Sequence, residues 1–430
     1  MHPMVKPALR RGWRDLNTVQ FGMAPAHAIV LGPVDTATGS FLTLLDGTRG
    51  LPLLRDEGRR MGLPDGHVDG LVERLARSGL LDDATGGGPA ADALRGKQAV
   101  LDRLRPDLAS LSLATSAPGE AIERLAARRS LRVQVRGAGR VGVVLAALLA
   151  GAGVGEVHVR DGGRVEPGDV APGGLSAECV GERREDAARR AVRKAAPDRR
   201  PRHRREPAPH PAEDRTPPSS EPAGRTCAPA GRTAVPPDES GWSLVILAPR
   251  DGLAVHAPDP AAVEPLIVSG TPHLYAGVVE GTGVVGPLVL PGETGCAGCL
   301  DRARTDRDQT WPRLVAQWRS GGRRQAQACD LALATAVAGL AAGHALAFLD
   351  GMPPVGAGTR WEASVPTLTW HARPVWPHPA CPCGAAGRGN EEHTPEDRGP
   401  HETMAEQQPP AGSRHEAHAA RLSGTWRAHV

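Results

Sequence analysis

The chain has 430 residues, enough for two or three domains, and its 53 glycines and 41 prolines exceed usual globular content. Its 3 Phe, 1 Tyr and 8 Trp supply no evident stacking surface for single-stranded nucleic acid. A formal net charge of +3 excludes a strong overall field for polyanions, so we expect no nucleic-acid partner.

Neither the first residues nor the most apolar segment indicates secretion or membrane insertion. Residues 1–14 are basic but no apolar stretch follows them, unlike a secretory signal. Residues 331–349 approach membrane length, yet they are mostly Ala and lie between Asp330 and Asp350, which favours a buried helix. The seven cysteines are not spaced as a disulfide framework. We therefore expect a cytoplasmic protein with no membrane partner.

Two segments are predicted to be disordered, an insertion over residues 197–240 and a tail over residues 387–430. The insertion contains no Leu, Ile, Met, Phe, Tyr or Trp, so it cannot bury enough apolar surface to offset its ordering entropy. Its arginines are interleaved with acids, which favours a solvated linker over an RNA-binding segment.

Residues 1–90 are predicted to form a small winged-helix-like α+β module. The runs 19–21 and 28–34 are expected to be strands, followed by short helices. In the last helix apolar residues recur at i, i+3, i+4 and i+7 from Val68, and Gly79 follows as a C-cap. That helix would expose acidic and basic side chains together, so DNA readout is not predicted.

A connector with one helix, residues 91–130, leads to the main domain over residues 131–386. That domain opens with a strand at 131–136, a glycine-rich loop, an apolar helix-length run and a second strand at 156–160. This order predicts an α/β fold of the Rossmann type with a mainly parallel sheet.

The glycine loop, Gly137-Ala-Gly139-Arg-Val-Gly142, and Asp161 form the candidate nucleotide site. In this fold the first glycine permits a tight turn, the second lets phosphate approach the backbone, and the third lets helix and strand pack closely. The helix N-terminus offers unpaired N–H groups to an anion, and Asp161 could accept hydrogen bonds from a ribose. The alternative is a Rossmann unit retained as a scaffold without a ligand.

Two cysteine pairs, Cys296-x-x-Cys299 and Cys381-x-Cys383, have the spacing of a closed tetrathiolate zinc site. Such a site keeps no open coordination position, so its role would be structural. The alternatives are four reduced thiols, or the replacement of one ligand by His378.

Three further cysteines are left over. Cys227 falls in the predicted insertion and therefore has no fixed electrostatic activation. Cys329 is expected to pack at the start of the Ala-rich helix. A chemical role for Cys179, close to the nucleotide loop, stays open.

The stretch after the second strand resembles the ThiF family, whose members are similar to ubiquitin-activating enzymes. The chain reads Asp161-Gly-Gly163-Arg-Val-Glu-Pro-Gly-Asp169-Val-Ala-Pro172, then Val-Gly-Glu-Arg-Arg184. ThiF proteins carry Asp-x-Asp-x-Val-Glu-x-x-Asn-Leu-x-Arg, followed by Val-Gly-x-x-Lys. Gly163, Asp169 and Pro172 therefore depart from the family pattern.

The resemblance implies an ATP and magnesium site in which Asp161 holds the ribose, Arg184 meets a phosphate and Asp251 coordinates the metal. It also agrees with zinc at the two cysteine pairs, and it implies a homodimer. The departures remove polar contacts that adenylation needs, so the resemblance implies a weakened nucleotide site.

Further motifs resemble a subgroup of ThiF-like proteins from azole-forming peptide natural-product pathways. They are Leu44-Leu-Asp-Gly-Thr48, Gly270-Thr-Pro-His273, Gly286-Pro-Leu-Val, Trp311-Pro and His378-Pro-Ala-Cys-Pro-Cys. The resemblance covers roughly residues 15–85 and 118–385. It implies that the N-terminal module captures a precursor leader peptide as an added strand, and that the ThiF-like body docks a cyclodehydratase partner.

Two alternatives remain at this stage. One is an active adenylyltransferase that activates the C-terminal carboxylate of a peptide or carrier protein. The other is an NAD-dependent oxidoreductase, because the glycine loop and Asp161 would serve a dinucleotide equally well.

Overall fold

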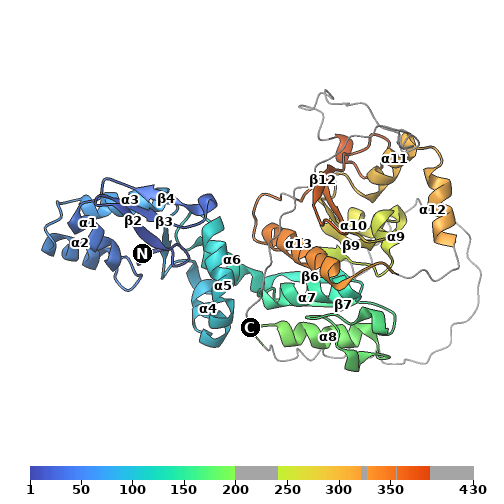
Figure 1. Cartoon of the computed structure of the whole chain (residues 1–430), viewed down its shortest axis with the longest axis horizontal. Helices are drawn as coiled ribbons and strands as arrows, with labels where there is room; N and C mark the ends of the chain where they lie inside the picture. Colours follow the sequence, from blue (N-terminus) through green and yellow to red (C-terminus); the bar gives the residue numbers. More distant parts are fainter. Residues whose placement is uncertain (199–240, 321–326, 355, 388–430) are drawn as a thin grey trace, which may run out of the picture. The chain divides into compact units, whose positions relative to one another are not determined.

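The computed structural model describes residues 1–198, 241–320, 327–354 and 356–387. Nearly all of the predicted insertion and of the predicted tail lies outside the described residues, as does Cys227. Figure 1 labels many of the helices and strands that are described below.

The N-terminal module contains two small antiparallel sheets and three α-helices. One sheet has the order β2 (Arg11–Asp15), β3 (Thr18–Phe21) and β4 (Ile29–Leu31), and the other pairs β1 (Pro3–Val5) with β5 (Leu81–Asp83). The helices are α1 (Thr36–Phe41), α2 (Leu51–Arg60) and α3 (His67–Arg77). The expected winged-helix-like α+β character is confirmed.

The core of this module follows the apolar spacing of the sequence. The four apolar residues of α3 that begin with Val68 are all buried, and they pack with Phe21, Phe41 and Leu54. The sequence predicted only β3 and β4 as strands. It missed β2 because all five of its residues are exposed, so the strand carries no apolar alternation.

The stretch between the module and the main domain is mostly helical. It contains α4 (Gly88–Arg95), α5 (Gln98–Ala114) and α6 (Glu120–Ala127), of which only the last was predicted. Leu94, Leu104 and Leu125 are buried in a separate hydrophobic core between these helices. Glycines 86–88 and Pro106 are typical of loops, yet Pro106 lies inside α5, where it is exposed.

The main domain is built on a seven-stranded sheet of order β12-β11-β10-β9-β8-β6-β7. The strands β6 (Arg132–Arg136), β7 (Glu156–Arg160), β8 (Leu244–Leu247) and β9 (His273–Val279) run parallel. The strands β10 (Thr282–Val289), β11 (Thr359–Ser364) and β12 (His371–Pro374) extend the sheet antiparallel. The predicted α/β Rossmann-type fold is confirmed.

Both faces of the sheet are covered near β9. The helices α7 (Arg140–Gly151) and α13 (Leu331–Leu349) pack on one face, where Leu274 and Ala276 point, and α8 (Arg184–Ala195) lies along α7 (Figure 1). On the opposite face Tyr275 packs with α10 (Pro260–Val268) and the start of α11 (Ala297–Arg307). Two more helices, α9 (Gly252–His256) and α12 (Trp311–Ser320), complete this side.

Helix α13 spans the residues that the sequence predicted as a helix, and part of it is buried. Asp330 caps its N-terminus through a 3.0 Å hydrogen bond from the Leu333 N–H, and Asp350 follows its last residue. It is long and apolar enough to cross a membrane, and 39% of its most apolar window is buried. Its buried stripe, from Leu333 to Ala345, contributes to the main core against α7 and β9.

Candidate functional site

The glycine loop lies at the carboxyl end of β6, where it turns into α7. Gly137 has a φ of +118°, and a Cβ built there would lie 1.9 Å from the carbonyl oxygen of Ala248. A Cβ at Gly142 would lie 2.1 Å from the carbonyl oxygen of Gly137. Both positions therefore require glycine, and the loop has the turn and the close packing expected of a nucleotide-binding fold.

Asp161 lies at the end of β7, directly beside this loop. Its carboxylate accepts hydrogen bonds from the N–H groups of Ala138, at 2.9 Å, and Gly163, at 2.8 Å. Burial raises the pKa of Asp161, but these hydrogen bonds and Arg184 outweigh burial and hold its pKa below the ordinary value. Asp161 is therefore an ionised, fixed carboxylate at the position predicted for ribose binding.

Arg184 also lies at this site, but its partner is Asp161 itself. Its Nε lies 2.9 Å from the Asp161 carboxylate, and its Nη1 donates to the carbonyl oxygen of Arg164 at 2.7 Å. The Arg184 and Asp161 side chains are only 12% and 9% exposed. The sequence predicted separate roles for these two residues, and the structure joins them in one ion pair.

Three residues that the sequence did not assign to the site complete a charged network. Asp169, which is 2% exposed, accepts a 2.6 Å hydrogen bond from Arg250 Nε and lies 3.5 Å from Arg184 Nη1. Arg250 also donates to Glu166 at 2.7 Å. Arg250 follows a parallel strand at its carboxyl end, a position that could have identified it, because such ends meet at one edge of the sheet.

Asp251 is placed differently from this network. It caps the N-terminus of α9, accepting a 3.0 Å hydrogen bond from the Leu253 N–H. Its side chain makes no ion pair with the described arginines. The predicted metal-coordinating role of Asp251 therefore stays a prediction.

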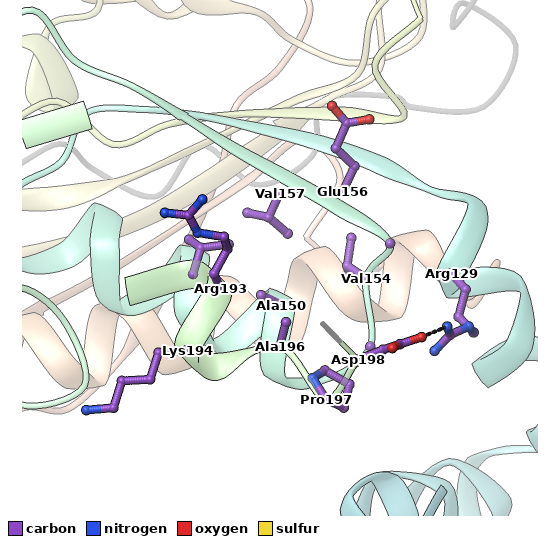
Figure 2. Close-up of a pocket in the computed structure, with 13 residues that line it drawn as sticks. Arg129, Ala150, Val154, Glu156, Val157, Arg193, Lys194, Ala196, Pro197 and Asp198 are labelled. Atoms are coloured by element: carbon purple, nitrogen blue, oxygen red, sulfur yellow. Dashed lines mark hydrogen bonds and ion pairs between the residues drawn. The ribbon is translucent and has the colours of Figure 1, made fainter. Parts of the chain in front are cut away.

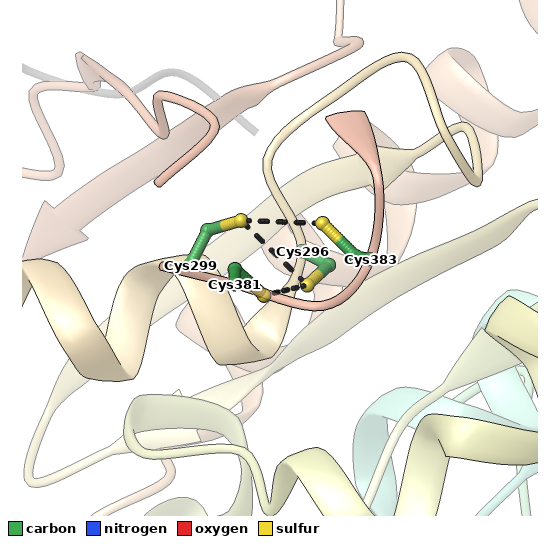
Figure 3. Close-up of side chains that lie close together, drawn as sticks. All are labelled: Cys296, Cys299, Cys381 and Cys383. Carbon is green, nitrogen blue, oxygen red and sulfur yellow. Dashed lines mark hydrogen bonds between the residues drawn. The ribbon is translucent and has the colours of Figure 1, made fainter. Parts of the chain in front are cut away.

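The four cysteines of the two predicted pairs come together in one cluster (Figure 3). Their ligand atoms all lie within 4.8 Å of one another, and the contacts Cys296–Cys299, Cys296–Cys381 and Cys299–Cys383 measure 3.8, 3.6 and 3.5 Å. Sulfurs around a tetrahedral zinc, with Zn–S bonds of about 2.3 Å, lie about 3.8 Å apart. The cluster therefore fits a metal ion such as zinc.

The local structure explains how these thiols converge. Cys296 is the N-cap of α11 and Cys299 lies in its first turn, while Cys381 and Cys383 lie in the segment after β12. A hydrogen bond from the Cys296 thiol lowers the pKa of Cys299 below its ordinary value. His378 is engaged elsewhere, with Nε2 2.7 Å from Asp306, so the four-cysteine set is favoured over its alternative.

The remaining described cysteines lie apart from this cluster. Cys329 is half-buried against the main core before α13, as predicted, and burial raises its pKa. Cys179 is half-buried, with Sγ 3.5 Å from Arg190 Nη2 and 3.4 Å from Ser176 Oγ. Among the described residues, neither sulfur makes a hydrogen bond to a side chain of the charged network beside the glycine loop.

A cavity of about 530 Å³ lies at the other end of the parallel strands (Figure 2). Ala150, Val157 and Val192 line it, and an ion pair of 2.6 Å between Arg129 and Asp198 stands at its rim. In open α/β sheets ligands bind beyond the carboxyl ends of the strands. This cavity, at the amino end of β7, is therefore not part of the nucleotide site.

In the three-stranded sheet of the N-terminal module, the two edge strands pair with no further strand among the described residues, and they differ in charge. The edge strand β2 carries Arg11, Arg14 and Asp15. The other edge strand, β4, lies in residues 22–34, which contain no Asp, Glu, Lys or Arg. Val30 of β4 is 48% exposed. Charged edges resist pairing with another strand, whereas an uncharged edge permits it.

Comparison with known proteins agrees with the α/β fold. The model of the ThiF family matches residues 116–384. A search of the curated proteins finds no match to this chain.

Solved structures share the fold at low sequence identity. E. coli MccB with ATP is 13% identical, with 89% of this chain and 99% of that chain covered and a TM-score of 0.58. The microcin C7 biosynthetic enzyme MccB in complex with N-formylated MccA is 13% identical, with 89% and 100% covered and a TM-score of 0.58. PaaA is 15% identical, with 86% and 99% covered and a TM-score of 0.59.

Proposed function

Because this chain belongs to the ThiF family, whose model matches residues 116–384, we propose that it works in ribosomal peptide modification. In this proposal the N-terminal module captures the leader of a precursor peptide, and the ThiF domain presents the peptide to a cyclodehydratase partner. The likeness to a microcin C7 biosynthetic enzyme supports a biosynthetic role. The observation that carries the proposal is the uncharged edge of β4, which pairs with no other strand in the part of the chain that the structure describes.

An extended peptide can bind such an edge by adding a strand to the sheet. Backbone hydrogen bonds would supply affinity, and alternate side chains would contact the apolar surface around the strand. Val30 is 48% exposed and Met23 is 72% exposed, so apolar side chains are available beside the edge. The other edge of β4 is paired with β3, whose residues Val19 and Phe21 are buried in the core of the module.

Contacts with the helical connector support the presenting role. Lys6, which is 2% exposed, donates to the carbonyl oxygen of Thr115 at 2.7 Å, and the Gly119 N–H donates to Asp82 at 2.7 Å. These bonds tie the module to the helices that lead into the ThiF domain. Binding of the leader to the module would thus raise the effective concentration of the precursor peptide at the active site of a partner bound to that domain.

The remaining parts of the proposal concern zinc, assembly and location. Zinc at the four cysteines would be structural, because four thiolates leave no open position, and it would join the start of α11 to the segment after β12. A homodimer and a cytoplasmic location, both carried over from the family resemblance and the composition, belong to the same proposal.

An active adenylyltransferase is the second candidate. The glycine loop with its required glycines and the solved MccB structure with ATP favour it. ATP–pyrophosphate exchange tests it directly. Robust exchange by the wild-type protein, lost in Asp251→Ala, would establish this candidate and displace peptide presentation as the main activity.

Leader capture is tested with the full-length protein and a panel of fluorescently labelled synthetic leader peptides, of which the tightest binder serves as the probe. Val30→Lys places a charge on the β4 edge, and we expect it to weaken binding by at least about tenfold. Arg14→Ala on the β2 edge is the matched control and should stay within about twofold of wild type. Equal losses in both variants, or unchanged binding in Val30→Lys, would refute capture at β4.

A further inference from the structure

The acceptor groups of Asp161 are already in use within the protein. One carboxylate oxygen accepts from Ala138 N–H, and the other accepts from both Gly163 N–H and Arg184 Nε. In a dinucleotide-binding fold this carboxylate receives the ribose hydroxyls. A ribose would therefore have to compete with a buried guanidinium for the same carboxylate.

The absence of a side chain at Gly163 makes room for this guanidinium. A Cβ built at Gly163 would lie 2.0 Å from Arg184 Nη2 and 2.6 Å from its Cζ. The guanidinium thus fills the space that any other residue at position 163 would need. The position of the Arg184 guanidinium therefore depends on glycine at position 163.

The approach to the glycine loop is covered from the other side by Arg250. A Cβ built at Gly139 would lie 3.4 Å from Arg250 Cγ and 3.7 Å from its Cβ, so the stem of this arginine lies over the second glycine. That glycine is the position where a phosphate would approach the backbone. Asp169 and Glu166 hold the Arg250 guanidinium in place.

We infer that the chain closes its own glycine loop to nucleotides through the ion-pair network Asp161–Arg184–Asp169–Arg250–Glu166. The residues present do not fit a nucleotide in this arrangement, because the ribose acceptor and the approach to Gly139 are both taken by internal side chains. Each arginine is paired with an acid, so neither is left to neutralise a phosphate. This inference goes beyond leader capture and does not depend on it.

The test measures binding of MgATP and, separately, of NAD⁺ to the full-length protein by isothermal titration calorimetry. The wild-type protein should bind either probe with a Kd weaker than about 1 mM. Gly163→Ala should displace the flexible end of Arg184 while leaving every charge in place. Arg184→Lys should keep the charge but lose the planar donor pair that meets Asp161 and the Arg164 carbonyl. Both variants should bind MgATP at least about tenfold more tightly than wild type.

Two matched controls accompany these variants. A Cβ at Gly162 would meet nothing within 4 Å, so Gly162→Ala should bind MgATP no better than wild type. Arg190→Lys changes an exposed arginine of the same helix, paired with Glu182, and should also leave binding unchanged. Thermal melting of each variant confirms that it is folded.

Two results would overturn the inference. One is a wild-type Kd for MgATP or NAD⁺ below about 1 mM, which would show an open site. The other is binding by folded Gly163→Ala and Arg184→Lys that is as weak as in wild type, which would show that Arg184 does not close the loop. The same variants should bind the leader peptide as tightly as wild type does. Nucleotide binding therefore tests closure of the glycine loop, and peptide binding tests leader capture independently.

Discussion

Arg128 and Asp350 form a buried, two-point ion pair between the end of the helical connector and the end of α13. The Nε and Nη2 of Arg128 each lie 2.7 Å from a carboxylate oxygen of Asp350, and the two side chains are 6% and 3% exposed. Arg128 Nη1 also donates to the carbonyl oxygen of Ala152, after α7, at 3.0 Å. One guanidinium thus joins three segments of the fold.

Asp350→Leu should lower the free energy of unfolding by about 3–5 kcal/mol, because it leaves Arg128 as a buried charge without its acid. The double variant Arg128→Met/Asp350→Leu should recover most of this loss, since no buried charge remains. Urea unfolding of the full chain measures both. The exposed pair Arg132–Glu156 is the control, and Glu156→Gln should cost less than about 1 kcal/mol. Similar losses in Asp350→Leu and Glu156→Gln would contradict this account.

The purified protein should contain one zinc ion per chain, bound by the four clustered cysteines. Elemental analysis gives the stoichiometry, and a chelator should lower the melting temperature as it removes the metal. Cys381→Ser should lose most of the zinc, whereas Cys329→Ser, outside the cluster, should keep it. Protein without zinc whose four thiols are freely alkylated in the native state would exclude a metal centre.

The stabilising effect of Asp161 should depend on pH in a defined direction. The pKa of Asp161 is lowered in the folded protein, so its ionised form contributes stability above the ordinary pKa of the unfolded chain, and this contribution disappears as pH falls through the folded pKa. The melting temperature of Asp161→Asn should therefore lie furthest below that of wild type at about pH 7. The gap should narrow steadily below about pH 4.

The exposed residue Asp186 supplies the control for this pH series, because it pairs with Arg189 on the surface of α8. Asp186→Asn should differ little from wild type over the whole range. A gap between wild type and Asp161→Asn that stays constant down to about pH 3 would show that the carboxylate charge is not what stabilises the site.

Residues 199–240 should be replaceable by a short Gly/Ser linker with little change in melting temperature, because no large apolar side chain is lost. A deletion that starts at residue 197 should cost more. It removes Asp198, whose carboxylate lies 2.8 Å from Lys97 Nζ and 2.6 Å from Arg129 Nη2. Thermal melting of the two deletion proteins distinguishes these outcomes, and a collapse of cooperative melting in the shorter deletion would disprove the expectation.

The sequence by itself determined the features that depend on local backbone and apolar spacing. The glycine loop is recognisable because only glycine tolerates the close approaches at Gly137 and Gly142. Helix α13 is recognisable because a long apolar run lies between two acids. The α/β fold follows from the order of strand, loop, helix and strand, which are all short-range signals.

Only the tertiary structure decided which charged groups meet. Arg184 and Asp161 are 23 residues apart, and Arg250 and Asp169 are 81 residues apart. A long arginine side chain can reach many acids, and its actual partner depends on how the intervening loops are folded. The edge strand β2 escaped prediction for a related reason, since its exposed residues pair through backbone hydrogen bonds that leave no pattern in the side chains.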